Sequence, residues 1–213
     1  MRVQSAAMTT PVNDPHFFGY GSLVNRQTHS YDNPRAARVT GWHRAWRRSS
    51  HRALCYLTAV PDSSDYIEGM IASVPGADWA ALDERERAYA RVTLGSEIRH
   101  DGGDLDVAIY AIAPGEHHAP TDDNPVLLSY LDVVVQGYFR EFGLDGVTHF
   151  FETTEGWNAP ILNDRADPIY PRAQVLSAEE TSLVDEGLSR LSAVVKERNE
   201  TGLSLVRMRG TGA

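Results

Sequence analysis

Apolar and β-branched residues dominate four short runs near the start of the chain and predict β-strands there. The four runs are His16–Tyr20, Ala37–Arg47, Leu54–Val60 and Tyr66–Val74. The last two flank Pro61-Asp62-Ser63-Ser64-Asp65, a cluster of turn-forming residues. We therefore expect these two runs to form a β-hairpin.

The pattern then changes to that of a helix. Residues from Trp79 to Tyr89 are rich in helix formers, and Asp78 before them is a suitable N-cap. Strand-like runs return at Val92–Ile98 and Asp106–Ile112, with a turn predicted at Asp101–Asp104 between them.

The remainder of the chain is mostly helical in pattern. Apolar residues recur at helical spacing from Leu128 to Phe142, with Asn124 as the expected N-cap, Pro125 in the first turn and Gly143 as the C-terminal stop. The sequence therefore predicts one helix that ends at this glycine.

A polar, proline-bearing stretch from Glu152 to Arg172 shows no obvious periodicity and predicts a packed functional loop or lid. Ser177 and Glu180 then have the spacing of a capping box, so we expect a last helix that runs to about Glu200. A length of 213 residues suits one domain, which we place at residues 14–200, with flexible termini at 1–13 and 201–213.

Charge and composition narrow the classes of function. A net charge of −9 argues against a nucleic-acid partner, although Arg44, Arg47, Arg48 and Arg52 form a local basic cluster. No run of 18 apolar residues predicts a membrane span, and the absence of a signal-peptide core favours the cytoplasm. We expect no membrane partner.

Disulfide and metal chemistry find little support in the sequence. The single cysteine, Cys55, excludes an internal disulfide and lies among apolar residues, as a buried structural thiol does. His117 and His118 are adjacent and should point apart, which disfavours a metal site.

The first candidate for chemistry follows the first strand, where His16-Phe17-Phe18 leads into Gly19-Tyr20-Gly21-Ser22-Leu23. A strand that ends in glycine and a small hydroxyl residue can direct consecutive backbone N–H groups into one concavity. Such a concavity binds a carboxylate or an oxyanion without a charged side chain. The alternative interpretation is a strand followed by an ordinary turn.

The second candidate is Glu86. Trp79, Leu82 and Tyr89 share one stripe of the predicted helix, and Glu86 falls within it, seven residues after Trp79 and three before Tyr89. A carboxylate on a buried face has a raised pKa, which makes Glu86 a candidate general acid/base. The alternative is a boundary glutamate that turns outward or pairs with Arg47 or Arg91.

The neighbours of Glu86 project from other faces of the same predicted helix. We expect Glu84, Arg85 and Arg87 to lie in solvent. Glu86, in contrast, falls in the middle of the stripe that should face the core.

Three motifs in order resemble those of the γ-glutamylcyclotransferase superfamily, and most closely its glutathione-specific branch. They are Tyr20-Gly21-Ser22-Leu23, Gly41-Trp42-His43-Arg44 and Leu82-Asp83-Glu84-Arg85-Glu86, which are similar to the family's YGSL loop, GWxR strand and LDxRE helix. In addition, Ser129-Tyr130 followed by Gly137 resembles the segment in which a tyrosine contacts substrate. The resemblance covers about residues 16–140.

This resemblance implies an α+β fold, in which a mixed sheet curls into a small β-barrel flanked by helices, with a C-terminal helical extension. It also implies cyclisation of a γ-glutamyl peptide or amine to 5-oxoproline, as in glutathione metabolism, with Glu86 as the general acid/base. Tyr20, Gly21, Ser22, Leu23 and Tyr130 would bind the substrate. No metal or organic cofactor is required, the partner is the small γ-glutamyl substrate, and the protein is a monomer or a homodimer.

Other functions remain open at this stage. The same pocket could serve a non-catalytic protein that binds a small carboxylate or a partner protein. A cyclotransferase for γ-glutamyl amines is also possible, because the Gly156–Arg172 segment does not match the glutathione-specific branch well. A serine hydrolase is disfavoured, since Ser22 lacks the Gly-x-Ser-x-Gly elbow and no histidine is identifiable as its base.

Overall fold

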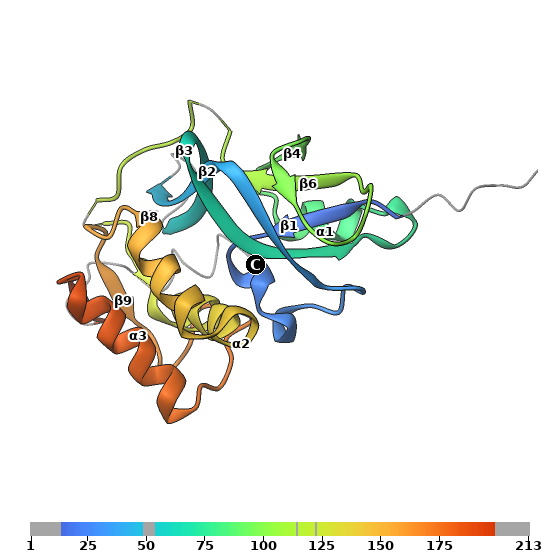
Figure 1. Ribbon diagram of the computed structural model, residues 1–213. Helices are drawn as coiled ribbons and strands as arrows, with labels where there is room; N and C mark the ends of the chain where they lie inside the picture. The colour runs from blue at the N-terminus through green and yellow to red at the C-terminus, as the bar shows by residue number, and fades with distance from the viewer. Residues whose placement is uncertain (1–13, 49–53, 114, 122, 199–213) are drawn as a thin grey trace, which may run out of the picture.

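Two long antiparallel strands, β2 (Arg35–Arg48) and β3 (Cys55–Ser73), form the frame of the molecule. The computed structural model describes residues 14–48, 54–113, 115–121 and 123–198. Figure 1 shows the two strands crossing the molecule side by side, with the other strands of the sheet on either side of them.

The main sheet of the described chain has seven strands, in the order β4-β6-β1-β3-β2-β5 with β8 also paired to β2. It is mixed, because β1 pairs parallel to β6 and β2 pairs parallel to β8, whereas the other neighbours are antiparallel. The remaining bounds are β1 (His16–Gly19), β4 (Ala90–Leu94), β5 (Ile98–Arg99), β6 (Val107–Ala111) and β8 (Thr154–Glu155).

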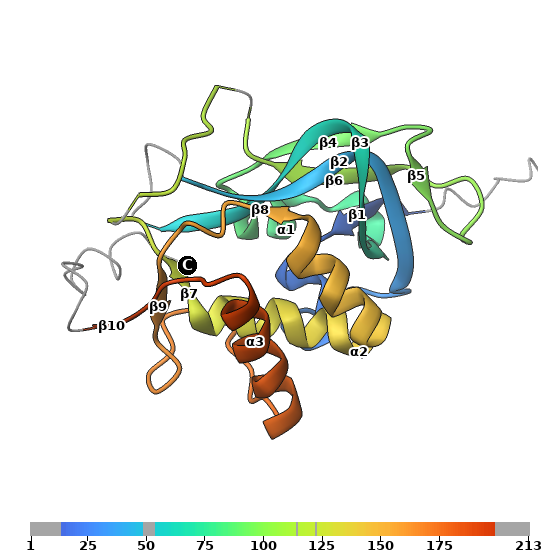
Figure 2. The same cartoon turned by 60° about the vertical axis from the view of Figure 1, so that its left-hand side comes forward.

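A smaller parallel sheet, in the order β10-β9-β7, is formed by strands from the C-terminal part and the segment before α2. Its strands are β7 (Val126–Leu127), β9 (Ile161–Asn163) and β10 (Val195–Glu197). Helices α2 (Leu128–Thr153) and α3 (Ala178–Arg190) pack together beneath the curled main sheet (Figure 2). This curled mixed sheet with a C-terminal helical part confirms the predicted fold class.

The predicted hairpin at residues 54–74 is wrong, because β3 is one continuous strand. Along the pair β2–β3, Thr40 is opposite Tyr66 and Trp42 is opposite Pro61, so that residues 62–65 bulge out opposite the single residue Gly41. Gly41 has a φ of +82°, which glycine adopts without strain. The turn chemistry is real but local: the Asp62 carboxylate accepts hydrogen bonds from the backbone and the hydroxyl of Ser64.

The helix predicted over Trp79–Tyr89 is shorter than expected. Helix α1 spans Ala80–Arg85, and its N-cap is Trp79 and not Asp78 as predicted, although the Asp78 carboxylate accepts a hydrogen bond from the Ala80 amide at 3.1 Å. Glu86 has a φ of −99° and a ψ of 23°, and the chain then turns so that β4 can begin at Ala90. The helix stops early because β4 must pair with β6.

The start of α2 also differs from the prediction, which gave Asn124 as the cap and Pro125 in the first turn. The helix begins at Leu128, because Val126 and Leu127 are extended and pair with β9. Gly143 interrupts α2 with a φ of +65°, as predicted, but a second helical stretch continues to Thr153.

The capping box of α3 is confirmed: Ser177 and Glu180 exchange side-chain-to-backbone hydrogen bonds. The predicted end of this helix at about Glu200 is wrong, since α3 ends at Arg190 and residues 195–197 form β10. Ser192 takes a φ of +51° between them, which breaks the helix. The termini that we expected to be flexible (1–13 and 201–213) lie outside the described residues, as does Arg52.

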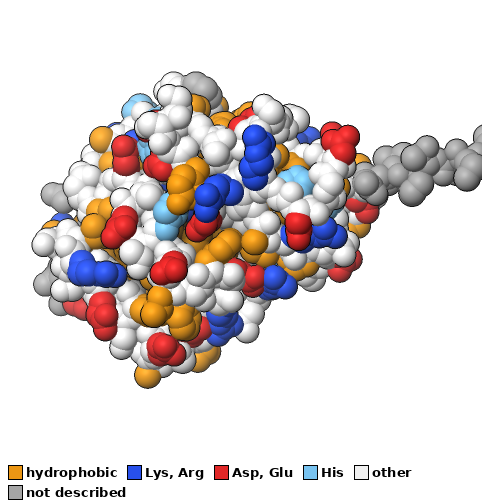
Figure 3. Space-filling model, in the orientation of Figure 1, with side chains coloured by type: hydrophobic (Ala, Val, Ile, Leu, Met, Phe, Trp, Pro, Cys, Tyr) orange, Lys and Arg blue, Asp and Glu red, His pale blue; other side chains and the backbone are white. Residues whose placement is uncertain are grey.

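Short 3-10 turns complete the structure: η1 (Ser22–Val24), η2 (Arg26–Thr28) and η3 (Pro75–Ala77). None of the described helices has the length and apolar character needed to cross a membrane. Basic and acidic side chains alternate over the face seen in Figure 3, so the described residues on that face give no continuous basic surface.

Arg44 of the Gly41–Arg44 motif lies in the core and is fully buried. Its guanidinium donates to the hydroxyls of Tyr138 (2.9 Å), Thr153 (2.6 Å) and Thr154 (3.1 Å). The Tyr138 hydroxyl in turn donates to the carbonyl oxygen of Tyr20, at 2.9 Å. Arg44 therefore joins the sheet, helix α2 and the turn after β1 in one hydrogen-bond network.

Candidate active site

A small pocket of about 30 Å³ lies where β1 ends, close to the end of α1 and the start of α2. It brings together all six residues that the sequence singles out: Tyr20, Gly21, Ser22, Leu23, Glu86 and Tyr130. The other lining residues are Phe18, Gly19, Leu57, Tyr89 and Tyr110.

The turn after β1 is shaped by two glycines that leave no room for a Cβ. A Cβ on Gly19 would lie 2.5 Å from the Cβ of Leu23, and one on Gly21 would lie 2.6 Å from the hydroxyl oxygen of Tyr130. The chain then enters η1, where the Val24 amide bonds to the Gly21 carbonyl. The amides of Ser22 and Leu23 come first in this turn and have no partner within it.

We expect Gly21→Ala to lower the free energy of unfolding by about 1–2 kcal/mol, because the new Cβ overlaps the Tyr130 hydroxyl. Tyr130→Phe removes that oxygen, and the next atoms from the Cβ are then 3.6 Å or more away. Urea denaturation of both single variants and the double variant should therefore show a much smaller cost of Gly21→Ala when it is combined with Tyr130→Phe. An equal cost in both backgrounds would place the strain elsewhere.

Both the side-chain hydroxyl and the backbone carbonyl of Tyr20 form hydrogen bonds within the protein. Its buried hydroxyl donates to the carbonyl oxygen of Tyr110 and accepts from the Ala59 amide at 3.0 Å. Burial raises the pKa of this phenol, so it stays neutral. Because its polar groups are engaged by the protein, Tyr20 shapes the pocket wall and positions the turn that follows.

Glu86 stands at the C-terminal cap of α1, with its amide bonded to the Leu82 carbonyl. Its side chain is 15% exposed, and its Oε1 lies 3.2 Å from the Nε of Arg85. Burial raises the pKa of Glu86, while the charges of Arg85 and Arg172 and the hydrogen bond from Arg85 partly offset that rise. The pocket thus contains a carboxyl group that is a stronger base than an exposed glutamate.

The alternative ion pairs considered for Glu86 do not form. Arg47 pairs with Glu155 at 2.8 Å, and Arg91 pairs with Asp83 at 2.9 Å. The apolar stripe behaves as predicted, since Trp79, Leu82 and Tyr89 all pack in the cluster that contains Phe17.

The prediction that Arg85 lies in solvent is wrong. Its side chain is 9% exposed and donates to the Thr28 carbonyl at 3.0 Å and to the Ser22 hydroxyl at 3.3 Å. The face of α1 that carries Arg85 is covered by the turns η1 and η2, which helical periodicity alone does not reveal. Arg85, which directly precedes Glu86, therefore connects the end of α1 to the Gly21–Leu23 turn.

Tyr130 forms the opposite wall, at the start of α2. Its ring packs edge-on against Trp46 at 6.1 Å and Tyr170 at 5.0 Å between centroids. Burial raises the pKa of its phenol far above the usual value, the nearby Tyr170 and Glu86 add to the rise, and a hydrogen bond from the Ser22 amide opposes it. Tyr130 thus presents a neutral hydroxyl close to the first amides of η1.

Sequence reasoning missed several residues of the site. Tyr110 reaches the pocket because β6 lies beside β1, and its hydroxyl donates to Asp83. Tyr89 was identified only as a core residue, and its hydroxyl donates to the Leu57 carbonyl at 3.0 Å. Arg172 and Tyr170 come from the segment that was predicted as a packed functional loop. No local pattern places Tyr110, Tyr170 or Arg172 near Glu86, because strand pairing and helix packing bring them there.

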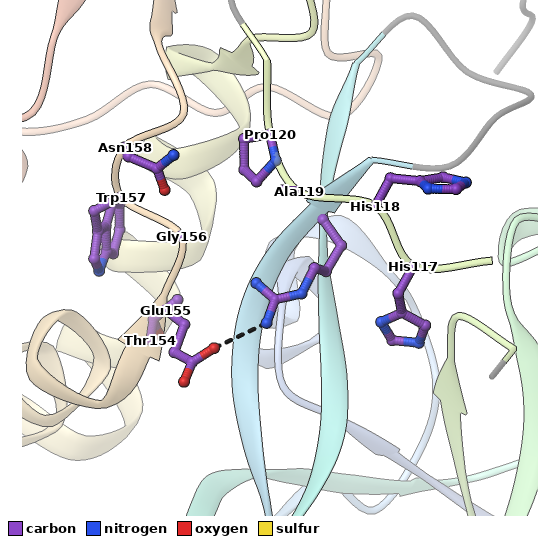
Figure 4. Close-up of a pocket in the computed structure, with 10 residues that line it drawn as sticks. His117, His118, Ala119, Pro120, Thr154, Glu155, Gly156, Trp157 and Asn158 are labelled. Atoms are coloured by element: carbon purple, nitrogen blue, oxygen red, sulfur yellow. Dashed lines mark hydrogen bonds and ion pairs between the residues drawn. The ribbon is translucent and has the colours of Figure 1, made fainter. Parts of the chain in front are cut away.

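A second, larger hollow, which Trp157 helps to line, is drawn in Figure 4. None of the six predicted site residues lines it, and its two charged side chains, Arg47 and Glu155, pair with each other. The rings of His117 and His118 point in different directions there (Figure 4). Within the described residues, no group of three or more His, Cys, Asp or Glu side chains could hold a metal ion.

Two structural features define the class of this protein. One is the curled mixed sheet, and the other is the turn after its first strand, which faces a largely buried glutamate. The family model described as "Gamma-glutamyl cyclotransferase, AIG2-like" matches residues 17–129, which is more than half of the chain and includes all three motifs. The chain belongs to this family, which confirms the superfamily expected from the motifs.

Solved structures show the same fold at low sequence identity. A structure named "Gamma-glutamyl cyclotransferase" and that of an uncharacterized protein from Homo sapiens each align with a TM-score of 0.53 and 14% identity, over 81% of this chain and 99% of theirs. YkqA from Bacillus subtilis aligns with a TM-score of 0.51 and 16% identity, over 68% of this chain and 56% of its own. A search of curated proteins found no match.

Proposed function

We propose that this protein is a γ-glutamylcyclotransferase, which converts a γ-glutamyl peptide or amine into 5-oxoproline and a free amino acid or amine. Glu86 serves as the general acid/base. The observation that supports this most strongly is the position of its buried carboxyl in the pocket formed by the Tyr20–Leu23 turn. Removing a carboxylate from water costs free energy, so its position in this pocket is better explained by a functional role than by a structural one.

Glu86 is suited to two proton transfers of the proposed reaction. The α-ammonium group of the substrate gives a proton to the Glu86 carboxylate, and the freed amine attacks the γ-carbonyl carbon. When the tetrahedral intermediate collapses, the C–N bond to the leaving group breaks and Glu86 returns the proton to the departing nitrogen. The ring nitrogen gives up its second proton, which the released amine takes up to leave as an ammonium ion. The raised pKa of Glu86 brings it closer to that of the groups with which it exchanges protons.

Negative charge develops on the γ-carbonyl oxygen during this attack, and the pocket offers neutral donors for it. These are the amides around Gly21 and Leu23 and the hydroxyl of Tyr130, to which the Ser22 amide donates.

Ring closure reduces what the protein has to supply. The nucleophile and the carbonyl belong to the same molecule and close a five-membered ring, and well-oriented intramolecular reactions reach effective concentrations on the order of 10⁵ M or more. Orientation and proton transfer then suffice, so the few polar groups of this pocket match the demands of the reaction.

The experiment that tests this function is a panel of γ-glutamyl compounds incubated with the purified full chain, with 5-oxoproline as the measured product. The panel contains glutathione, γ-glutamyl-alanine, γ-glutamyl-glutamate and the γ-glutamyl adduct of the lysine side-chain amine. We expect 5-oxoproline and the free amine in equal amounts from at least one of them. Tight binding without product would instead support the non-catalytic alternative.

The acid limb of the pH profile of kcat/KM should report the pKa of Glu86 and the effect of Arg85 on it. We expect kcat/KM to fall below a pKa that lies above the usual range of a glutamate, because burial raises it. Arg85→Gln removes a charge that opposes this rise, so the acid limb should move to higher pH, whereas Arg85→Lys keeps the charge. A limb that stays in place or moves to lower pH in Arg85→Gln would argue that the titrating group is not Glu86.

A further inference from the structure

Arg172 is a cation beside the pocket that forms no ion pair within the part of the chain that the structure describes. Its side chain is half-buried, and within the described residues no carboxylate pairs with it; its carbonyl oxygen accepts a hydrogen bond from Gln174. Other half-buried arginines near the site do have acidic partners, such as Arg85 with Glu86 and Arg165 with Asp132. A half-buried guanidinium that is not in an ion pair can accept the carboxylate of a ligand as its partner.

The segment that carries Arg172 is fixed against the start of α2. The buried Asp164 carboxylate accepts hydrogen bonds from the amide and the hydroxyl of Ser129, at 2.8 and 2.6 Å, and from the Ile169 amide at 2.8 Å. The ring of Tyr170 packs on Tyr130, which lines the pocket. The chain is therefore held in place two residues before Arg172.

Arg172 lies in a tight turn that follows Tyr170. The Ala173 amide bonds to the Tyr170 carbonyl at 3.1 Å, which closes a turn with Pro171 and Arg172 at its centre. Burial raises the pKa of both Glu86 and Tyr31, and the charges of Arg85 and Arg172 oppose that rise at each of them. The guanidinium thus lies near both groups.

We propose that Arg172 binds a carboxylate on the leaving group of the substrate, so that the protein favours γ-glutamyl amino acids and peptides over γ-glutamyl amines. This inference rests on the proposed function. The glutamyl end of the substrate faces the Gly21–Leu23 turn and Glu86, and the leaving group extends from the scissile nitrogen toward the Tyr170–Ala173 turn. A guanidinium binds a carboxylate there through paired, charge-assisted hydrogen bonds.

The test compares two substrates that differ only in this carboxylate, γ-glutamyl-alanine and γ-glutamyl-ethylamide. We expect the wild-type protein to favour γ-glutamyl-alanine by about 10- to 100-fold in kcat/KM, as one charge-assisted contact provides. Arg172→Gln should lose that preference by slowing γ-glutamyl-alanine alone, and Arg172→Lys should keep part of it. Arg190→Gln, which changes an exposed arginine at the end of α3, is the matched control and should change neither substrate.

Two kinetic outcomes would overturn the proposal. If Arg172→Gln slows both substrates equally, Arg172 acts on the glutamyl end or on the fold. If it slows neither, Arg172 does not contact the substrate.

A binding measurement separates this proposal from the proposed function. Calorimetry on Glu86→Gln and on Glu86→Gln/Arg172→Gln needs no turnover, and we expect only the second variant to bind γ-glutamyl-alanine about as weakly as γ-glutamyl-ethylamide. If the wild-type protein turns over neither these two compounds nor any other member of the panel, the proposed function fails, yet this binding difference would still support the role of Arg172. Equal affinities of Glu86→Gln for the two compounds would contradict it.

Discussion

Glu86→Gln is expected to lower kcat by about 10²- to 10⁴-fold, the usual contribution of a positioned general acid/base, while the protein stays folded. The amide has nearly the same size and can accept a hydrogen bond from Arg85, but it cannot exchange protons with the substrate. The measurement is the rate of 5-oxoproline release at saturating substrate, with circular dichroism as the check on folding.

The chain provides a matched control for this substitution two residues earlier. Glu84 has a side chain that is 72% exposed and pairs with Arg87 on the surface of α1. Glu84→Gln makes the same chemical change outside the pocket, so it should leave turnover unchanged. Similar losses in both variants would show that the effect does not come from proton transfer by Glu86.

The Glu86→Gln substitution should also make the protein more stable at neutral pH. Burial raises the pKa of folded Glu86 above that of the unfolded chain, so the wild-type protein loses stability as pH rises from the unfolded pKa through the folded one. Glutamine carries no charge and avoids this loss. We therefore expect a higher melting temperature for Glu86→Gln at pH 7 and a difference that shrinks as the pH falls below the unfolded pKa.

Arg44→Met should cause the largest loss of stability, about 3 kcal/mol or more in the free energy of unfolding. The fully buried guanidinium donates to three hydroxyls and lies over the rings of Tyr138 and Phe150, at 5.2 and 5.3 Å from their centroids. Methionine fills part of the volume but leaves these acceptors without a donor. Chemical denaturation with urea measures the difference.

Arg47→Met is the control for Arg44→Met, because it lies on the same strand and removes the same charge. Arg47 forms a surface ion pair with Glu155, whose side chain is 57% exposed, and such pairs contribute at most about 1 kcal/mol. Comparable destabilisation by both substitutions would mean that the buried network of Arg44 adds little to the stability of the fold.

Local signals in the sequence predicted those features that depend on neighbouring residues. The capping box of Ser177 and Glu180 forms as its spacing predicts, and Glu86 faces the pocket as its place in the apolar stripe predicts. Each of these features depends on residues within about two helical turns, where periodicity and capping chemistry determine the geometry.

Features that depend on a distant partner were not predictable in the same way. The turn cluster at Pro61–Asp65 does not reverse the chain, because β2 bends at Gly41 and continues to pair beyond it. Arg85 is buried because η1 and η2 cover it. In both cases the local structure depends on which distant segment packs against the residue, and a single sequence does not reveal that segment.

The central claim is that the Glu86 carboxyl itself transfers the protons in this pocket, and chemical rescue tests it most directly. Glu86→Ala removes the carboxyl and leaves space in the pocket that a formate ion can enter. We predict that this variant releases little 5-oxoproline alone and that added formate restores the reaction in proportion to its concentration, with no such effect on the wild-type protein. Wild-type rates from Glu86→Ala without formate would contradict the claim.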